Sequence, residues 1–238
     1  MKGEGENKRY AISDPLSHVG SVEITQQELE QYMGYQGWNS GVAIWGDQPV
    51  KAAPAPAASN PGDFPFTAEQ VARAIDAPLE NVQQYLPGIV KTLRDAGITD
   101  PNEIIGVLAT IKAENWNFAP MTENSDGSAY EGREDLGNTQ PGDGARYIGR
   151  GFIQLTGRGN YQEYSRRLGI DLVGNPELAN DPEIAAKIVV LYFQDRGVDQ
   201  AAKAQDWRQV RLLVNGGYNG WDVFSAAVEG LGQELRRG

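Results

Sequence analysis

Apolar residues recur every three or four positions through most of residues 66–238, which is the period of helices that bury one face. Start signals precede several of these segments: Thr67 before a segment through Ile75, Asp100 with Pro101 and Glu103, and Asp181 with Pro182 and Glu183. Further helices are predicted over 79–96, where Pro87 is expected to kink or divide the helix, 160–168, 207–214 and 221–235. We therefore expect a mainly α fold.

Two stretches break this pattern. Residues 51–65 are rich in Pro and Ala and are predicted to be a linker between a small N-terminal head of unknown role, residues 1–50, and a catalytic domain, residues 66–238. The head is expected to hold one helix, Thr25 to Met33. Residues 120–147 are polar and follow neither the helix nor the strand period, and so long a connection inside a domain is usually functional or disordered.

Composition narrows the chemistry. The chain has no cysteine and a single histidine, His18, which excludes thiolate nucleophiles, disulfides, histidine-based triads and the usual zinc sites. Acid–base work is left chiefly to carboxylates, and we expect neither a metal nor a cofactor. A net charge of −11 argues against nucleic acid as a partner.

The length of the apolar runs and the polarity of the first residues indicate where the protein is expected to act in the cell. No run approaches the roughly 18 to 20 residues that a membrane helix needs, so we expect no membrane insertion. The first ten residues are charged and polar and do not resemble a secretory signal. We expect synthesis in a cytoplasm and action on a cell wall after release or delivery.

Glu114 and Glu123 are the leading candidate pair. Glu114 ends the helix predicted after Asp100, and Glu123 stands nine positions later, where the polar interval begins. Inverting glycosidases place a protonated acid and an ionised base about 6.5–9.5 Å apart across the sugar. Apolar neighbours such as Trp116 and Phe118 are expected to raise the pKa of Glu114, whereas polar neighbours would keep Glu123 ionised. Most such glutamates are merely solvated surface charges, so spacing alone is weak support.

A resemblance adds to this. Residues 147–161, YIGRGFIQLTGRGNY, closely resemble the signature of family 19 glycoside hydrolases, the plant-type chitinases and their bacterial and phage endolysin relatives. The similarity extends over most of residues 64–238 and includes YEGREDLGNTQPGDGARY and VNGGYNGWD. It implies a two-lobed, lysozyme-like helical domain with Glu114 as the general acid and Glu123 as the base.

The same resemblance implies roles for further residues. Thr156 would help to hold the attacking water; the alternative is that it caps a helix. Gln154, Asn160 and Asn215 match polar residues that line the sugar cleft; the alternative is that they are turn residues. A YxxR element is expected to shape the cleft through Tyr130 and Arg133. Glu131 and Glu134 are rival second carboxylates that break the nine-residue spacing.

This chain departs from the family next to the acid. Relatives usually place a histidine or another residue before the acid and Thr/Ser-Gly-Gly after it, whereas Ala113 precedes Glu114 and Asn115, Trp116 and Asn117 follow. Trp116 is expected to narrow the cleft or alter the preferred sugar, and these departures leave full activity open.

The resemblance predicts cleavage of β-1,4 bonds in an N-acetylated aminosugar polymer. Peptidoglycan is the first expectation, because the 130–147 element is similar to those of wall-degrading members, and chitin is the second. Two alternatives remain: a catalytically weakened sugar-binding component of a phage tail or secretion machine, and an enzyme acting on small glycans. In the first of these the head would serve to dock the chain to a protein partner or a wall.

Overall fold

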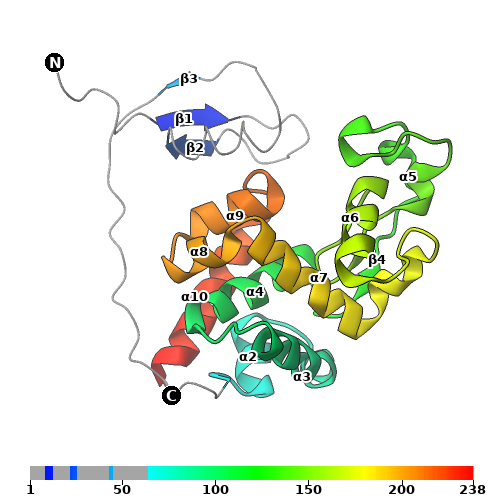
Figure 1. The fold of residues 1–238 in the computed structure, drawn as a ribbon. Coiled ribbons are helices and arrows are strands. Elements are labelled where there is room, and N and C mark those ends of the chain that lie inside the picture. The colour runs from blue at the N-terminus through cyan, green and yellow to red at the C-terminus, as the bar shows by residue number, and fades with distance from the viewer. Residues whose placement is uncertain (1–8, 13–21, 26–42, 45–63, 238) are drawn as a thin grey trace.

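The computed structural model describes residues 9–12, 22–25, 43–44 and 64–237. In the last of these ranges the chain is helical, with two short strands (Figure 1). Its α-helices are α2 (Ala68–Ala74), α3 (Leu79–Asp95), α4 (Pro101–Glu114), α5 (Asp143–Arg146), α6 (Arg158–Leu168), α7 (Pro182–Asp195), α8 (Val198–Lys203), α9 (Trp207–Asn215) and α10 (Trp221–Arg237). The mainly α fold predicted from the sequence is confirmed.

The described part of the head is a small antiparallel sheet in the order β2-β1-β3, which the sequence pattern did not predict. Its strands are β1 (Arg9–Ile12), β2 (Val22–Thr25) and β3 (Ala43–Ile44), with Tyr10 opposite Ile24 and Ile44. The predicted helix from Thr25 to Met33 lies outside the described residues, except that Thr25 ends β2.

The predicted helix starts are confirmed by their caps. Thr67 accepts a hydrogen bond from the Gln70 backbone at the start of α2, and the Gln70 side chain accepts one in return from the Thr67 backbone. Asp100 and Asp181 each accept two backbone hydrogen bonds at the starts of α4 and α7. Each cap satisfies N–H groups that the helix itself leaves unpaired.

Three details of the prediction are wrong. Pro87 does not divide α3, because it lies on the exposed face of the helix, where water can satisfy the carbonyl that loses its partner. Glu103 stands three residues after the cap Asp100, a spacing that predicts a capping box, but its buried carboxylate instead pairs with Lys203 of α8 at 3.2 Å. Helix α8 itself was missed, since six residues carry too short an apolar pattern to recognise.

The polar interval 120–147 is ordered by short elements rather than structureless. It contains β4 (Met121–Thr122), the 3₁₀ turns η1 (Ser128–Tyr130) and η2 (Glu134–Leu136), and α5. Strand β4 pairs with β5 (Arg150–Gly151), so that Thr122 lies opposite Arg150. This pairing ties the start of the interval to the segment that follows it.

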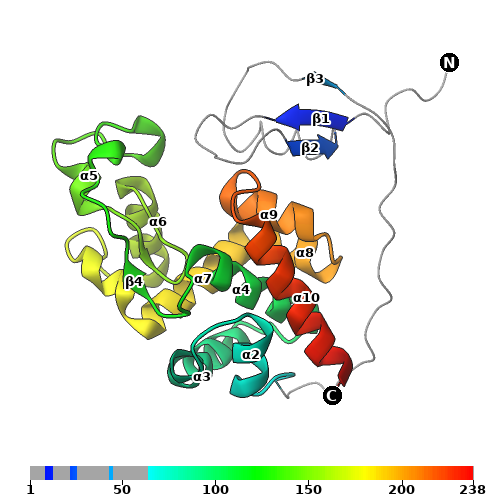
Figure 2. The ribbon, with the colours of Figure 1, turned by 180° about the vertical axis from the view of Figure 1, so that it is seen from behind.

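Two hydrophobic clusters divide the helical body into lobes, as the resemblance implied. The larger cluster joins residues of α2, α3, α4, α7, α8, α9 and α10. The smaller lies among α5, α6 and α7 and consists of Tyr147, Leu155, Tyr161, Tyr164, Leu172, Ala179 and Ile188. Helix α7 contributes to both clusters and runs between the lobes (Figure 1). Seen from behind, α10 crosses α4 in the larger lobe (Figure 2).

Helix α4 is the centre of the larger lobe, and this decides where Glu114 lies. Residues Ile104 to Ile111 of this helix are buried without a break, and its neighbours include α8, α9 and α10. A helix apolar all round belongs in the middle of a core. Phe64, at the end of the predicted linker, packs edge-on against Phe66 beside the same core.

Candidate active site

Glu114 is the last residue of α4, and its carboxylate meets a buried arginine. Arg211 of α9 donates from Nη1 to Glu114 Oε1 at 2.5 Å. The Arg211 side chain is only 2% exposed, against 18% for Glu114. The rest of the guanidinium is held by the carbonyl of Asn219, which accepts from both Nε and Nη2. The acid candidate is therefore fixed from the side of α9.

Arg211 was not among the residues predicted from the sequence. The neighbours expected around Glu114 were apolar, and one of these, Trp116, is 69% exposed rather than packed around the carboxylate. A signal was present in the sequence: Arg211 interrupts the apolar run of α9, four residues before Asn215, so the two share a helix face. Asn215 ends α9, and its buried Oδ1 has no hydrogen-bond partner within the described residues.

Glu123 follows β4 and is held by three hydrogen bonds. Its Oε1 accepts from the Gly149 backbone N–H at 2.6 Å, and its Oε2 accepts from the Tyr130 hydroxyl at 3.0 Å. Its own backbone N–H donates to the Gly149 carbonyl at 2.9 Å. Both carboxylate oxygens are thus oriented, which suits a group that must take a proton from a fixed direction.

Tyr130 is a donor that stays protonated. Burial, together with its hydrogen bond to Glu123, raises the pKa of the Tyr130 hydroxyl above its ordinary value of 10.0. The Tyr130 carbonyl accepts in turn from the side chain of Asn138, which is fully buried and also accepts from the Arg158 backbone. The polar interval therefore exists largely to fix this tyrosine beside Glu123.

Gly149 marks the point where the predicted residues of the smaller lobe converge. A side-chain carbon placed there would lie 3.0 Å from Gln154 Oε1, 3.3 Å from Glu123 Cδ and 3.3 Å from Thr156 Oγ1. Any side chain at this position would press on these three groups, so the close approach requires glycine. The residue was part of the quoted signature but was not singled out, because a glycine carries no chemistry of its own.

Thr156 is not a helix cap. The residue at the cap of α6 is Gly157, without a side-chain hydrogen bond, whereas the Thr156 hydroxyl donates to the Gln154 carbonyl at 2.9 Å. Its proton is thus committed, and the oxygen lone pairs remain free to accept. Gln154 adopts a left-handed φ of 53° and donates its amide to Met121 and Gly151 carbonyls. Such strain in a residue other than glycine is often found at functional sites.

Other predicted residues have local partners. Asn160 donates its side-chain amide to the Thr156 carbonyl at 2.7 Å, and Arg133 pairs with Asp135 through two bonds of 2.6 and 2.7 Å. The rival Glu131 accepts from two backbone N–H groups at the start of α5 and so has a structural role. Glu134, the other rival, is exposed.

The described residues do not meet the requirements of a three-ligand metal site or of a membrane-spanning helix. Among the described residues, no group of three or more His, Asp or Glu side chains is arranged to hold a metal ion. Over the same part of the chain, none of the helices combines the length and apolarity required to cross a bilayer.

Two lobes that each contribute one oriented glutamate are the arrangement of the lysozyme-like class of glycoside hydrolases. Comparison with known proteins agrees with this. The family described as chitinase class I, glycoside hydrolase family 19, matches residues 102–206, which include Glu114, Glu123 and the 147–161 signature. This match supports assignment of the chain to the family and a glycosidase activity.

Solved structures share the fold. Chitinase C from Streptomyces griseus HUT6037 has a TM-score of 0.58 and 19% identity over 82% of this chain and 80% of its own. A mutant of chitinase C has a TM-score of 0.59 and 21% identity over 73% of this chain and 96% of its own. A bacterial family 19 chitinase, described as differing from plant enzymes, has a TM-score of 0.54 and 18% identity over 71% of this chain and 96% of its own. The lysozyme-like helical fold is confirmed.

Proposed function

We propose that the chain hydrolyses β-1,4 bonds between N-acetylated aminosugars with inversion, using Glu114 as general acid and Glu123 as general base. Glu114 protonates the leaving oxygen. In giving up this proton it returns to the carboxylate form that pairs with Arg211, and the buried guanidinium stabilises the charge as it develops. Neither a metal nor a cofactor has a part in this scheme.

The observation that carries the proposal is the convergence of Glu123 and Thr156 beside Gly149. Both lie close to this glycine, and the Thr156 hydroxyl already donates to the Gln154 carbonyl. A water held between these two side chains would donate one hydrogen to Glu123 and the other to Thr156, which leaves its lone pair free to attack. One of its two acceptors is then the general base that an inverting mechanism requires.

We propose supporting roles for the remaining residues. Tyr130 orients Glu123, Asn160 holds the Thr156 backbone, and Gln154 joins the backbones of β4 and β5. Asn215 offers an unpaired acceptor to a substrate N–H or hydroxyl, since buried polar atoms without a partner are costly unless a ligand satisfies them. Arg133 acts at most through the turn that carries Tyr130.

Two polymers contain the required bond. Peptidoglycan stays the first proposed substrate, supported by the 130–147 element that resembles wall-degrading members, and the protein would reach it after release or delivery. Chitin is supported by the relatives, which are named as chitinases. Turnover of purified cell walls and of colloidal chitin, compared at equal protein concentration, separates the two.

The mechanism is tested with a defined oligosaccharide. We expect NMR at early times to show products of inverted anomeric configuration. Glu114→Gln and Glu123→Gln should each lower kcat by about 10²–10⁴-fold, the usual contribution of a general acid or base. Glu134→Gln is the matched control, because this exposed carboxylate should leave kcat unchanged. Retained configuration, or unchanged turnover in either of the first two variants, would refute the mechanism. Binding of the oligosaccharide without hydrolysis by the wild type would support a sugar-binding component instead.

A further inference from the structure

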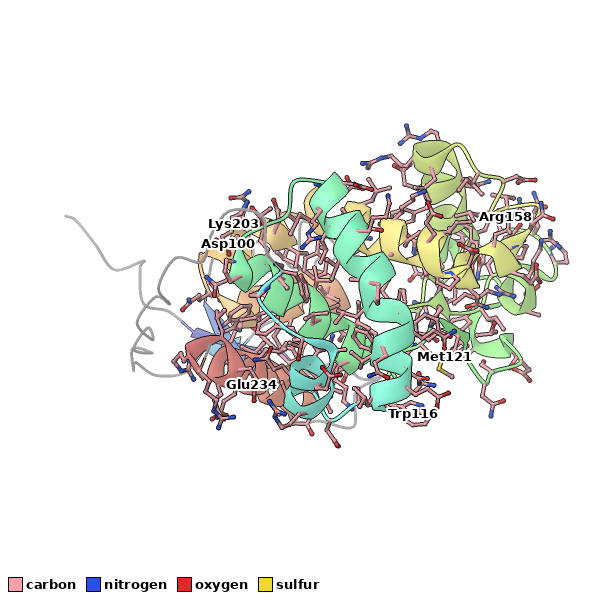
Figure 3. The ribbon with its side chains drawn as sticks, turned by 90° about the horizontal axis from the view of Figure 1, so that it is seen from below. Asp100, Trp116, Met121, Arg158, Lys203 and Glu234 are labelled. Carbon is pink, nitrogen blue, oxygen red and sulfur yellow. The ribbon has the colours of Figure 1, made fainter. Side chains whose placement is uncertain are left out.

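Trp116 is the most exposed of the large apolar side chains that the structure describes. Its side chain is 69% exposed, whereas Leu79, Leu178 and Val223 range from 38% to 41%. It stands two residues after Glu114, at the end of α4 that lies away from Asp100 (Figure 3). An aromatic side chain of this size that stays in water forgoes the stabilisation that burial would give.

The turn that carries Trp116 is held in place by hydrogen bonds. Asn115 is 2% exposed; it donates its side-chain amide to the Ala119 carbonyl and accepts from the Asn117 backbone. Asn117 accepts from the Ala119 backbone through its side chain, and its carbonyl accepts from the side chain of Asn81 in α3 at 2.7 Å. These bonds tie the turn to itself and to α3.

Two further anchors fix the turn from either side. Phe118 is fully buried against Phe152, and it holds a left-handed φ of 57°, which a non-glycine residue adopts only when its surroundings enforce it. Lys112 donates from Nζ to the carbonyls of Asp76 and Trp116, at 2.6 and 3.2 Å, and so joins the α2–α3 turn to this one.

The same short turn thus buries one aromatic ring and presents the other. If Trp116 were exposed through loose packing, the neighbouring backbone would not be so fully hydrogen-bonded. Fixing the ring in water beforehand removes part of the ordering cost of binding a flat ligand surface. The same turn carries the polar side chains of Asn115 and Asn117, and an aromatic ring on a polar turn suits a ligand with one apolar face and polar edges.

We propose that Trp116 is a sugar-stacking platform that binds one ring of the polymer next to the bond that Glu114 protonates. The apolar face of an N-acetylated aminosugar lies against the indole, and the sugar hydroxyls and acetamide contact the polar rim of the turn. Trp116 therefore does not narrow the cleft by packing beside Glu114. It extends the binding surface outward, and this inference rests on the proposed substrate class.

Binding is measured first without turnover. In the Glu114→Gln background, titration with chitin oligosaccharides of two to six units should shift or quench the indole fluorescence. The affinity should rise once the oligosaccharide is long enough to reach the platform. Adding Trp116→Ala should weaken the longer oligosaccharides about tenfold and leave the dimer almost unchanged. Trp116→Tyr, which keeps a ring, should recover most of that loss.

Turnover provides the second readout. Trp116→Ala should raise KM for long oligosaccharides about tenfold with kcat within a factor of two, because stacking binds substrate and transition state alike. Leu178→Ala removes another exposed apolar side chain and is the matched control; it should change neither KM nor affinity. Thermal unfolding of each variant shows whether the turn has remained intact.

The outcomes separate this inference from the mechanism. If Glu114→Gln abolishes hydrolysis and Trp116→Ala leaves affinity and KM unchanged for every length, the platform is refuted and the mechanism stands. If the wild type hydrolyses nothing but Trp116→Ala still weakens oligosaccharide binding, the platform stands and the mechanism fails. Equal weakening by Trp116→Ala and Trp116→Tyr, with lowered thermal stability in both, would show that the residue only supports the turn.

Discussion

The two candidate glutamates are positioned by opposite means. Glu114 ends the most buried helix of the larger lobe, and a single long-range ion pair with Arg211, 97 residues away, sets its carboxylate. Glu123 lies in a polar segment with little core of its own, and several hydrogen bonds to Gly149 and Tyr130 set its direction. A packed core gives one residue a fixed position, whereas a polar network gives another residue a fixed orientation.

This difference predicts how substitutions near each glutamate affect stability and activity. Damage on the Glu114 side should cost both stability and activity, because the partner of Glu114 is buried with it. Damage around Glu123 should cost activity with less change in stability, because the affected groups are partly solvated and can find water.

The largest effect is expected from Arg211→Met. It removes the guanidinium and leaves Glu114 without its ionic partner, so we expect a loss of about 2–4 kcal/mol in the free energy of unfolding, at the lower end of buried pairs because Glu114 is partly exposed. The kcat should fall about 10²-fold or more. Urea unfolding and steady-state kinetics measure the two quantities.

A double variant tests whether the effect arises from the ion pair. Arg211→Met combined with Glu114→Gln should be more stable than Arg211→Met alone, because no unpaired carboxylate remains. If the stability loss of the double variant equals the sum of the losses of the two single variants, the two side chains act independently. The ion pair would then not be what positions Glu114.

Gly149→Ala is expected to show the opposite pattern. The new methyl group would press on Glu123, Thr156 and Gln154 at 3.0–3.3 Å and displace them by a few tenths of an ångström. We expect kcat to fall about 10–100-fold, because small misplacements of catalytic groups are costly, with a stability loss under about 1.5 kcal/mol. Circular dichroism melts alongside kinetics would reveal both.

Gly88→Ala is the matched control for that substitution. Gly88 lies within α3, and an added carbon there meets nothing within 4 Å. Alanine should stabilise the protein by about 0.5–1 kcal/mol and leave kcat unchanged. A loss of activity at Gly88, or a loss of stability at Gly149 larger than the effect on catalysis, would contradict the division drawn between the lobes.

The smallest effect concerns the other buried carboxylate of α4. Burial raises the pKa of Glu103 above its ordinary 4.5, although Lys203 opposes this. The folded protein therefore holds this proton more tightly than the unfolded chain, so the stabilising contribution of Glu103 is complete below about pH 4.5 and is lost as the pH rises through the folded value.

Glu103→Gln removes that dependence. The unfolding free energy of the variant minus that of the wild type should increase by on the order of 1 kcal/mol from pH 4 to pH 7. Urea denaturation of both proteins at the two pH values measures this. A relative loss over the same interval would mean that the Lys203 pair outweighs the cost of burial. Activity per folded molecule should not change, because Glu103 lies at the opposite end of α4 from Glu114.

The sequence by itself determined most of the helical body. Helix starts at Thr67, Asp100 and Asp181 follow from local chemistry, because a side-chain cap acts within three residues of itself. The placement of Glu114 at a helix end, and the family signature around Gly149 and Thr156, were likewise readable from neighbouring positions.

Only the tertiary structure decided which groups meet. The Arg211–Glu114 pair joins residues 97 positions apart, and the Asn180 side chain reaches Thr122 across 58. The turn that carries Trp116 is held by Lys112, which bonds to the Trp116 carbonyl, and by Asn81 of α3, which bonds to the next residue, Asn117. Caps and periodicity are local and appear in the sequence, whereas a contact between distant elements depends on how the whole chain packs.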